Sequence, residues 1–209
     1  MSAARIERVV TAGTFSLDGG TWEVENNVWL YGDDEVVAVI DAAHDAAAII
    51  SAIGGRRVPY IICTHGHDDH INAAVELSDL TDAPVLLHPD DRMLWDTVHP
   101  DRAPDIDLGE DDELDIGGRF GLRVLHTPGH SPGAVCLHGS GVVFSGDTLF
   151  QGGPGATGRS YSDFPTILDS IRERLLVLPA ETRVLTGHGD ETTIGAEAAS
   201  YDDWVLRGH

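Results

Sequence analysis

Metal-binding side chains are concentrated in one short stretch of the sequence. His65, His67, Asp69 and His70 place four potential ligands within six residues. Neither a strand nor a helix directs four such side chains to one side, so we expect a turn that joins a strand to a helix. On such a turn His65 and His67 can converge on one ion. Asp69 and His70, on the first turn of the helix, can reach a second ion.

Three later segments each place one imidazole or carboxylate among small residues at the end of an expected strand. They contain His130, Asp147 and His188, and their small neighbours allow the backbone to approach closely. Imidazole and carboxylate donors without a thiolate suit zinc, and also iron or manganese. A carboxylate that can bridge two ions favours a centre with two metals, typically about 3.5–4 Å apart.

The elements that must position these side chains follow from the apolar runs and from the Gly and Pro residues between them. We expect strands over residues 24–30, 35–40, 58–63, 84–87, 120–125, 133–137, 142–145 and 182–186. We expect helices over residues 45–53, 71–80, 90–98, 163–178 and 194–206. The acidic stretch 101–115 is expected to be a solvated loop. Interleaved strands and helices predict an α/β fold in which sheets are covered by helices.

The order and spacing of the seven candidate ligands resemble the metallo-β-lactamase superfamily, and within it the glyoxalase II-like hydrolases (hydroxyacylglutathione hydrolase-like proteins). The resemblance covers nearly the whole chain and implies one domain over residues 1–209. The implied fold is a four-layer αβ/βα sandwich, with two mixed β-sheets flanked by helices and the metals at one edge between the sheets. It implies that metal one is bound by His65, His67 and His130, metal two by Asp69, His70 and His188, and that Asp147 bridges them.

This resemblance implies a binuclear-metal hydrolase that holds two divalent ions, with zinc expected first and iron or manganese as alternatives. Two ions that share a water lower its pKa, so that hydroxide exists near neutrality. The metal-bound hydroxide is expected to attack a carbonyl carbon, and Asp69 to accept a hydrogen bond from it and aim it. We find no obvious general acid near the motifs. A thioester fits best, because a thiolate leaves without protonation.

Residues on the substrate side are less well defined. Glyoxalase II-like hydrolases carry Gly-Arg-Ser/Thr-Asp after the bridging aspartate, whereas residues 158–163 here have two extra residues before the aspartate. Arg159 is expected either to bind a substrate carboxylate or to tie its loop to the domain, and Tyr161 to line the pocket or simply to pack. The chain ends soon after His188, so no glutathione-binding helical domain is expected. The sequence also has no lysine, so mycothiol is considered beside glutathione as the thiol.

Three alternatives to a thioesterase remain open. A persulfide dioxygenase with a similar fold would use one iron, held by His65, His130 and Asp147. A lactonase would apply the same two-metal chemistry to an ester. A metal-binding module without turnover is the remaining class, although structural zinc sites are normally closed and hold a single ion.

Composition disfavours nucleic-acid and membrane partners, and a small-molecule substrate is the partner that we expect. The 209 residues carry 35 acidic and 13 basic side chains, a formal charge of −22, which disfavours nucleic acid. No apolar run approaches the roughly 20 residues of a membrane span, and residues 1–10 do not resemble a signal peptide. Cys63 and Cys136 are expected to be small buried hydrophobic residues in a reducing, cytoplasmic environment.

Several polar residues lie outside the motif. The histidines expected to be solvated are His44, His99, His138 and His209. Asp41 follows an apolar strand and has two possible roles: it can orient a ligand imidazole or cap a helix.

Overall fold

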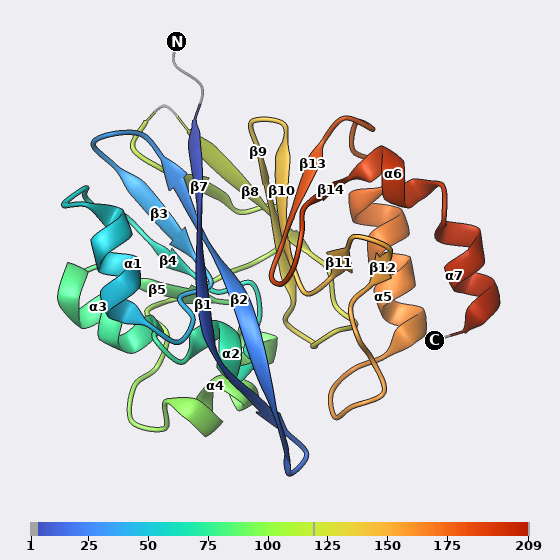
Figure 1. The fold of residues 1–209 in the computed structure, drawn as a ribbon, viewed down its shortest axis with the longest axis horizontal. Coiled ribbons are helices and arrows are strands. Elements are labelled where there is room, and N and C mark those ends of the chain that lie inside the picture. The colour runs from blue at the N-terminus through green and yellow to red at the C-terminus, as the bar shows by residue number, and fades with distance from the viewer. Residues whose placement is uncertain (1–3, 119, 209) are drawn as a thin grey trace.

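The computed structural model describes residues 4–118 and 120–208, which form two six-stranded β-sheets packed face to face (Figure 1). The first sheet has the order β1 (Arg5–Leu17), β2 (Gly20–Gly32), β3 (Val37–Ile40), β4 (Ile61–Ile62), β5 (Val85–Leu87) and β6 (Ile106–Asp107). The second has the order β14 (Thr192–Thr193), β13 (Arg183–Thr186), β10 (Val142–Gly146), β9 (Val135–Gly139), β8 (Gly121–His126) and β7 (Glu113–Asp115). Each sheet mixes parallel and antiparallel pairs.

Helices cover the outer face of each sheet. The first sheet is covered by α1 (Ala46–Ile53) and α3 (Ala74–Thr81), with α2 (Asp68–Ile71), η1 (Pro89–Asp91) and α4 (Arg92–Val98) near its lower edge in Figure 1. The second is covered by α5 (Phe164–Ser170), its π-type continuation η2 (Ile171–Leu175), α6 (Ile194–Ala198) and α7 (Tyr201–Arg207). A small hairpin joins β11 (Leu149–Phe150) to β12 (Gly153–Pro154). The fold is therefore the four-layer αβ/βα sandwich that the family resemblance implies.

Aromatic side chains dominate the layer between the two sheets. Trp29 and Tyr31 of β2 meet Phe144 of β10 edge to face, at ring-centroid distances of 6.2 and 5.7 Å. All three side chains are buried. The indole N–H of Trp29 also donates a hydrogen bond to the carbonyl of Thr186, 2.9 Å away in the other sheet. Apolar burial and edge-to-face contacts both stabilise this layer, so the relative position of the two sheets is fixed.

The strand directions bring the candidate ligands to one edge of the sandwich. β10 and β13 are parallel, and β8 runs the same way because it and β10 are both antiparallel to β9. The segments that follow these three strands therefore meet at one edge. β4 of the other sheet ends at the same place, since Val135 N–H donates to the carbonyl of Thr64 at 2.8 Å.

The structure corrects several sequence-based boundaries. β1 was not predicted, although the Asp18-Gly19 turn between it and β2 is a hairpin signal. The acidic stretch 101–115 contains the short strands β6 and β7 and is not only a loop. The final helix is divided into α6 and α7. The helix expected over 71–80 corresponds to α3, and the separate short helix α2 precedes it. Among the described residues, no helix has both the length and the apolar character needed to cross a membrane.

Candidate metal centre

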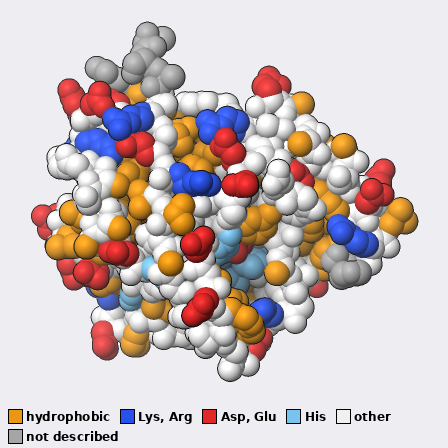
Figure 2. Space-filling model, in the orientation of Figure 1, with side chains coloured by type: hydrophobic (Ala, Val, Ile, Leu, Met, Phe, Trp, Pro, Cys, Tyr) orange, Lys and Arg blue, Asp and Glu red, His pale blue; other side chains and the backbone are white. Residues whose placement is uncertain are grey.

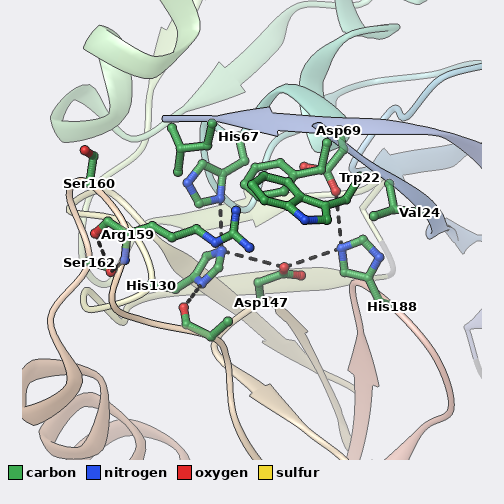
Figure 3. Close-up of a pocket in the computed structure, with 13 residues that line it drawn as sticks. Trp22, Val24, His67, Asp69, His130, Asp147, Arg159, Ser160, Ser162 and His188 are labelled. Atoms are coloured by element: carbon green, nitrogen blue, oxygen red, sulfur yellow. Dashed lines mark hydrogen bonds and ion pairs between the residues drawn. The ribbon is translucent and has the colours of Figure 1, made fainter. Parts of the chain in front are cut away.

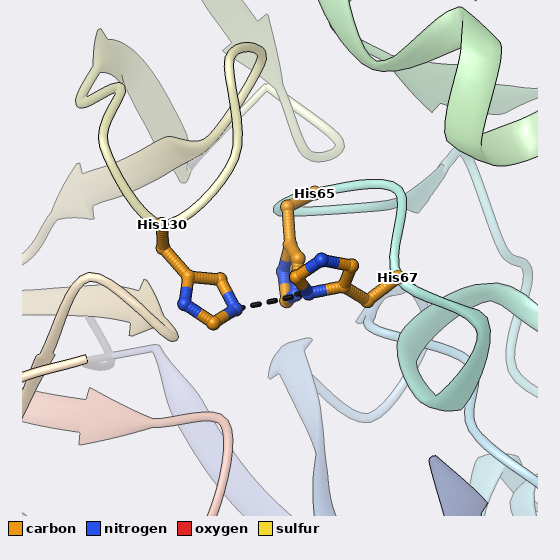
Figure 4. A group of neighbouring side chains, drawn as sticks. All are labelled: His65, His67 and His130. Carbon is orange, nitrogen blue, oxygen red and sulfur yellow. Dashed lines mark hydrogen bonds between the residues drawn. The ribbon is translucent and has the colours of Figure 1, made fainter. Parts of the chain in front are cut away.

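Three imidazoles form the first cluster, which consists of His65, His67 and His130 (Figure 4). His65 and His67 lie on the turn between β4 and α2, and His130 lies between β8 and β9. The Nδ1 atom of His67 is 3.1 Å from Nε2 of His65 and 2.9 Å from Nε2 of His130. All three side chains are buried. The nitrogens of the three rings therefore face a common point.

The second cluster consists of Asp69, His70 and His188. Asp69 and His70 lie on the short helix α2, and His188 follows β13. Nε2 of His188 is 3.2 Å from Nε2 of His70 and 3.3 Å from Oδ2 of Asp69. This arrangement supplies two imidazoles and one carboxylate.

Asp147 lies between the two clusters (Figure 3). Its Oδ2 is 3.6 Å from Nε2 of His130 in the first cluster and 3.4 Å from Nε2 of His188 in the second. Its Oδ1 is 3.4 Å from Nε2 of His70. The glycine before His188 makes this approach possible, because a Cβ at Gly187 would lie 2.3 Å from Oδ1 of Asp147. A single carboxylate thus reaches both clusters.

Hydrogen bonds from the surrounding chain orient these side chains. Nδ1 of His70 is 3.0 Å from Oδ2 of the buried Asp41, so Asp41 serves the orienting role rather than that of a helix cap. Nδ1 of His130 is 2.8 Å from the carbonyl of Ala156, and Nδ1 of His188 is 2.7 Å from the carbonyl of Glu25. These contacts leave Nε2 of each ring directed into the centre.

A series of hydrogen-bonded side chains that reaches Asp69 was not predicted from the sequence. Nδ2 of Asn26 donates to Oδ2 of Asp69 at 3.0 Å, and Oδ1 of Asn26 is 2.9 Å from Nε2 of His44. His44 was expected to be solvated, but it is half-buried and also contacts Asn72 through Nδ1 at 2.9 Å. No local pattern indicates this series, because β2 brings Asn26 to the site from a distant part of the sequence.

The two clusters differ in their electrostatics. Burial, reinforced by the neighbouring His130, lowers the pKa of His67 to about 3, and burial also lowers the pKa of His65. Burial acts in the same direction on His188, but the charge of Asp147 and hydrogen bonds to carboxylates outweigh it and raise the pKa of His188 to about 10. His65 and His67 of the first cluster are therefore held in the neutral form, whereas carboxylates next to His188 in the second cluster favour its charged form.

The donor set fits divalent metal ions. Oδ1 of Asp147 is buried and has no hydrogen-bond partner among the described residues. The imidazole nitrogens of the first cluster approach one another at hydrogen-bond distances, yet a neutral imidazole has only one N–H to donate. Cations at the two clusters would satisfy these lone pairs, and neutral imidazole with carboxylate suits zinc, iron or manganese.

A cavity of about 220 Å³ opens above the clusters (Figure 3). Its floor includes His67, Asp69, His130, Asp147 and His188. The β1–β2 hairpin provides an apolar wall, which was not expected because β1 was not predicted. That wall consists of Phe15, Leu17, Trp22 and Val24.

Arg159 lines the same cavity, whereas Tyr161 does not. The guanidinium carbon of Arg159 lies 3.8 Å from the ring centroid of Trp22 and 5.4 Å from that of Phe15. Within the described part of the chain, this guanidinium donates no hydrogen bond. The neighbouring Ser160 donates from N–H and Oγ to the carboxylate of Asp18 at the hairpin tip. Tyr161 has a side chain that is 55% exposed, so the structure does not bring it to the site.

Comparisons with known proteins agree with the fold. The family model described as "Metallo-beta-lactamase superfamily" matches residues 21–188. Hydroxyacylglutathione hydrolase GloC of Haemophilus influenzae is 33% identical over 194 residues, which cover 84% of this chain and 91% of that protein. The crystal structure of the BLEG-1 B3 metallo-beta-lactamase superposes with a TM-score of 0.77 at 32% identity, covering 90% of this chain and 97% of that one. TTHA1623 in a di-iron-bound form gives 0.75 at 34% identity, covering 84% and 93%.

Proposed function

Because this chain belongs to the metallo-beta-lactamase superfamily, we propose that it is a binuclear-metal hydrolase that cleaves a thioester of a small thiol. The observation that carries the proposal is the position of Asp147, whose carboxylate reaches a histidine in each cluster. His65, His67 and His130 would hold one ion, Asp69, His70 and His188 the other, and Asp147 would bridge them. When bound, two divalent ions supply an activated water and polarise a carbonyl oxygen.

The protein side chains have distinct tasks in this proposal. Asp41 holds the ring of His70 in one orientation through the 3.0 Å contact at Nδ1. Asp69 receives a hydrogen bond from Asn26 on Oδ2, which fixes the carboxylate that would accept a hydrogen bond from the attacking water and aim it. Of the residues that the structure describes, no His, Lys or Arg other than the clusters' own histidines and Arg159 lines the cavity. A leaving group that needs no proton, such as a thiolate, is therefore favoured over an amine.

The cavity also suggests the charge of the substrate. The guanidinium face of Arg159 lies against the ring of Trp22. Its N–H groups donate no hydrogen bond to the described residues, and the carboxylate of Asp18 interacts with it only electrostatically. Such a group recognises a carboxylate through paired hydrogen bonds. We therefore place a carboxylate-bearing part of the thioester against Arg159, and its apolar part against the wall formed by the β1–β2 hairpin.

A substrate panel tests the proposal. The protein is assayed with S-lactoylglutathione, an S-acyl mycothiol, a lactone and a β-lactam, both as purified and after treatment with a chelator. We expect a thioester to be cleaved fastest and the activity to disappear when metal is removed. Faster cleavage of the lactone or β-lactam would replace the thioesterase assignment. Oxygen uptake with a persulfide and no hydrolysis would replace it with a dioxygenase.

A further inference from the structure

Asp91 is a buried carboxylate outside the seven candidate ligands, with 0% of its surface exposed. It lies at the end of η1, and the proposed hydrolysis gives it no role. Its Oδ2 accepts hydrogen bonds from the N–H of Gly66 at 2.7 Å and from Oγ of Ser131 at 2.6 Å. Its Oδ1 accepts one from the N–H of Gly133 at 2.6 Å. Three short hydrogen bonds therefore converge on one buried side chain.

These three donors belong to the two segments that carry the first cluster. Gly66 separates His65 from His67 on the turn after β4, and Ser131 directly follows His130 on the loop after β8. The two segments come from different sheets. Asp91 is thus a direct polar link between the two segments, made through Gly66, Ser131 and Gly133 and not through the imidazole rings.

Only a carboxylate can make all of these hydrogen bonds at this position, and the surrounding backbone packs closely against Asp91. All three partners are donors, so both oxygens of Asp91 act only as acceptors, a set that an amide side chain cannot reproduce at both positions. The backbone also fits tightly, because a Cβ at Gly133 would lie 2.7 Å from the backbone nitrogen of Asp91. The described hydrogen bonds of Asp91 reach neither Asp69 nor His188 of the second cluster.

We propose that Asp91 is a positioning residue that fixes the separation of the two segments carrying His65, His67 and His130, and so sets the affinity of the first cluster for its ion. This inference rests on the metal roles proposed above. Among the described residues, Asp91 links the segments of the first cluster and makes no hydrogen bond to the ligands of the second. Loss of Asp91 should therefore weaken the binding of one of the two ions selectively.

The test measures metal affinity rather than turnover. Asp91→Asn and wild type are loaded with Co²⁺, and each is titrated with a chelator while metal per chain and the Co²⁺ absorption spectrum are recorded. We expect Asp91→Asn to release one ion about 10–100-fold more readily, as loss of a group that orients metal ligands typically does, and to hold the other as wild type does. A His188→Ala background, in which the second cluster lacks a donor, should show the same loss for its remaining ion.

Two further variants separate positioning from general destabilisation. Ser131→Ala removes one of the three hydrogen bonds and should increase the release of the same ion by a smaller factor. This variant tests the proposal even if Asp91→Asn fails to fold. Asp33→Asn is the matched control: its carboxylate accepts two backbone N–H groups in the turn between β2 and β3, and metal release should be unchanged. The proposal would be overturned if Asp91→Asn and Ser131→Ala weakened the binding of both ions equally or of neither ion. The proposed hydrolytic function would still stand if the wild type hydrolyses a thioester. A wild type that takes up no ion at the first cluster would overturn both proposals.

Discussion

At the scale of single residues, the seven candidate ligands could be predicted from spacing and order along the chain. The side chains that support them could not. Asn26, His44 and Asp91 reach the centre through contacts between distant segments, and nothing next to them in the sequence marks them. The sequence allowed Asp41 either to orient an imidazole or to cap a helix, and only the folded structure shows its contact with Nδ1 of His70.

The first prediction concerns Asp147. Asp147→Ala removes the carboxylate that reaches both clusters, and bound metals contribute several kcal/mol to transition-state stabilisation. We expect kcat to fall by at least about 100-fold, equivalent to roughly 3 kcal/mol, while the circular dichroism spectrum is unchanged. Steady-state kinetics on the best thioester of the panel measures this loss. Full activity in Asp147→Ala would contradict the bridging role.

The second prediction concerns Arg159. Arg159→Met retains an apolar side chain against Trp22 but has no N–H donors. We expect KM for a carboxylate-bearing thioester to rise about 10-fold or more, since a hydrogen bond to a charged group contributes about 1.5–3 kcal/mol, and kcat to change little. The control is a neutral thioester of similar size, for which KM should hardly change. An equal effect on both substrates would assign Arg159 only to holding its loop.

At the scale of secondary-structure elements, the strands and helices next to the motifs were predicted with few errors, and the first strand was missed. Residues 5–17 mix polar and apolar side chains without long apolar runs, so the strand is recognisable mainly from the Asp-Gly turn that follows it. Because β1 was not predicted, the apolar wall of the cavity was not expected either. Phe15 and Trp22 come from the two strands that this turn joins.

A third prediction concerns the packing of the two sheets. Phe144 of β10 contacts Trp29 and Tyr31 of β2 and is fully buried. Phe144→Ala should lower the free energy of unfolding by about 3–5 kcal/mol. Val177→Ala, at a side chain that is 70% exposed, should change it by no more than about 0.5 kcal/mol. Denaturant unfolding of both variants compares them, and similar losses would refute the packing argument.

At the scale of the whole molecule, a strongly acidic chain presents a recessed cluster of histidines. The formal charge is −22, and Figure 2 shows the histidines in a hollow near the middle of one face, with acidic and basic side chains around it. The four-layer fold follows from the resemblance carried by the ligand pattern. The exact approach of the two sheets, which creates the centre between them, depends on long-range packing that local sequence patterns do not encode.

A fourth prediction follows from the different protonation of the two clusters. Burial acts to lower the pKa of His70, but the charges of Asp69, Asp147 and Asp41 outweigh it and raise that pKa, and the pKa of His188 is raised to about 10. Protons must therefore leave these rings before an ion can bind, and the affinity of the second cluster should rise at least about 10-fold per pH unit near neutrality. Because the pKa of His67 is lowered to about 3, that ring has no proton to lose near neutrality. Metal titrations at about pH 6 and pH 8 should change the affinity of the second cluster at least about 100-fold and that of the first cluster much less; equal changes at both clusters would contradict this assignment.

Turnover measured while metal is added back to metal-free protein tests the central claim most directly. Zn²⁺, Fe²⁺ and Mn²⁺ are added separately, metal per chain is counted by mass spectrometry, and thioester hydrolysis is followed on the same samples. The two clusters joined by Asp147 predict that activity rises to a plateau at two ions per chain. A plateau at one iron per chain, with oxygen consumed and no thioester cleaved, would contradict a binuclear hydrolase.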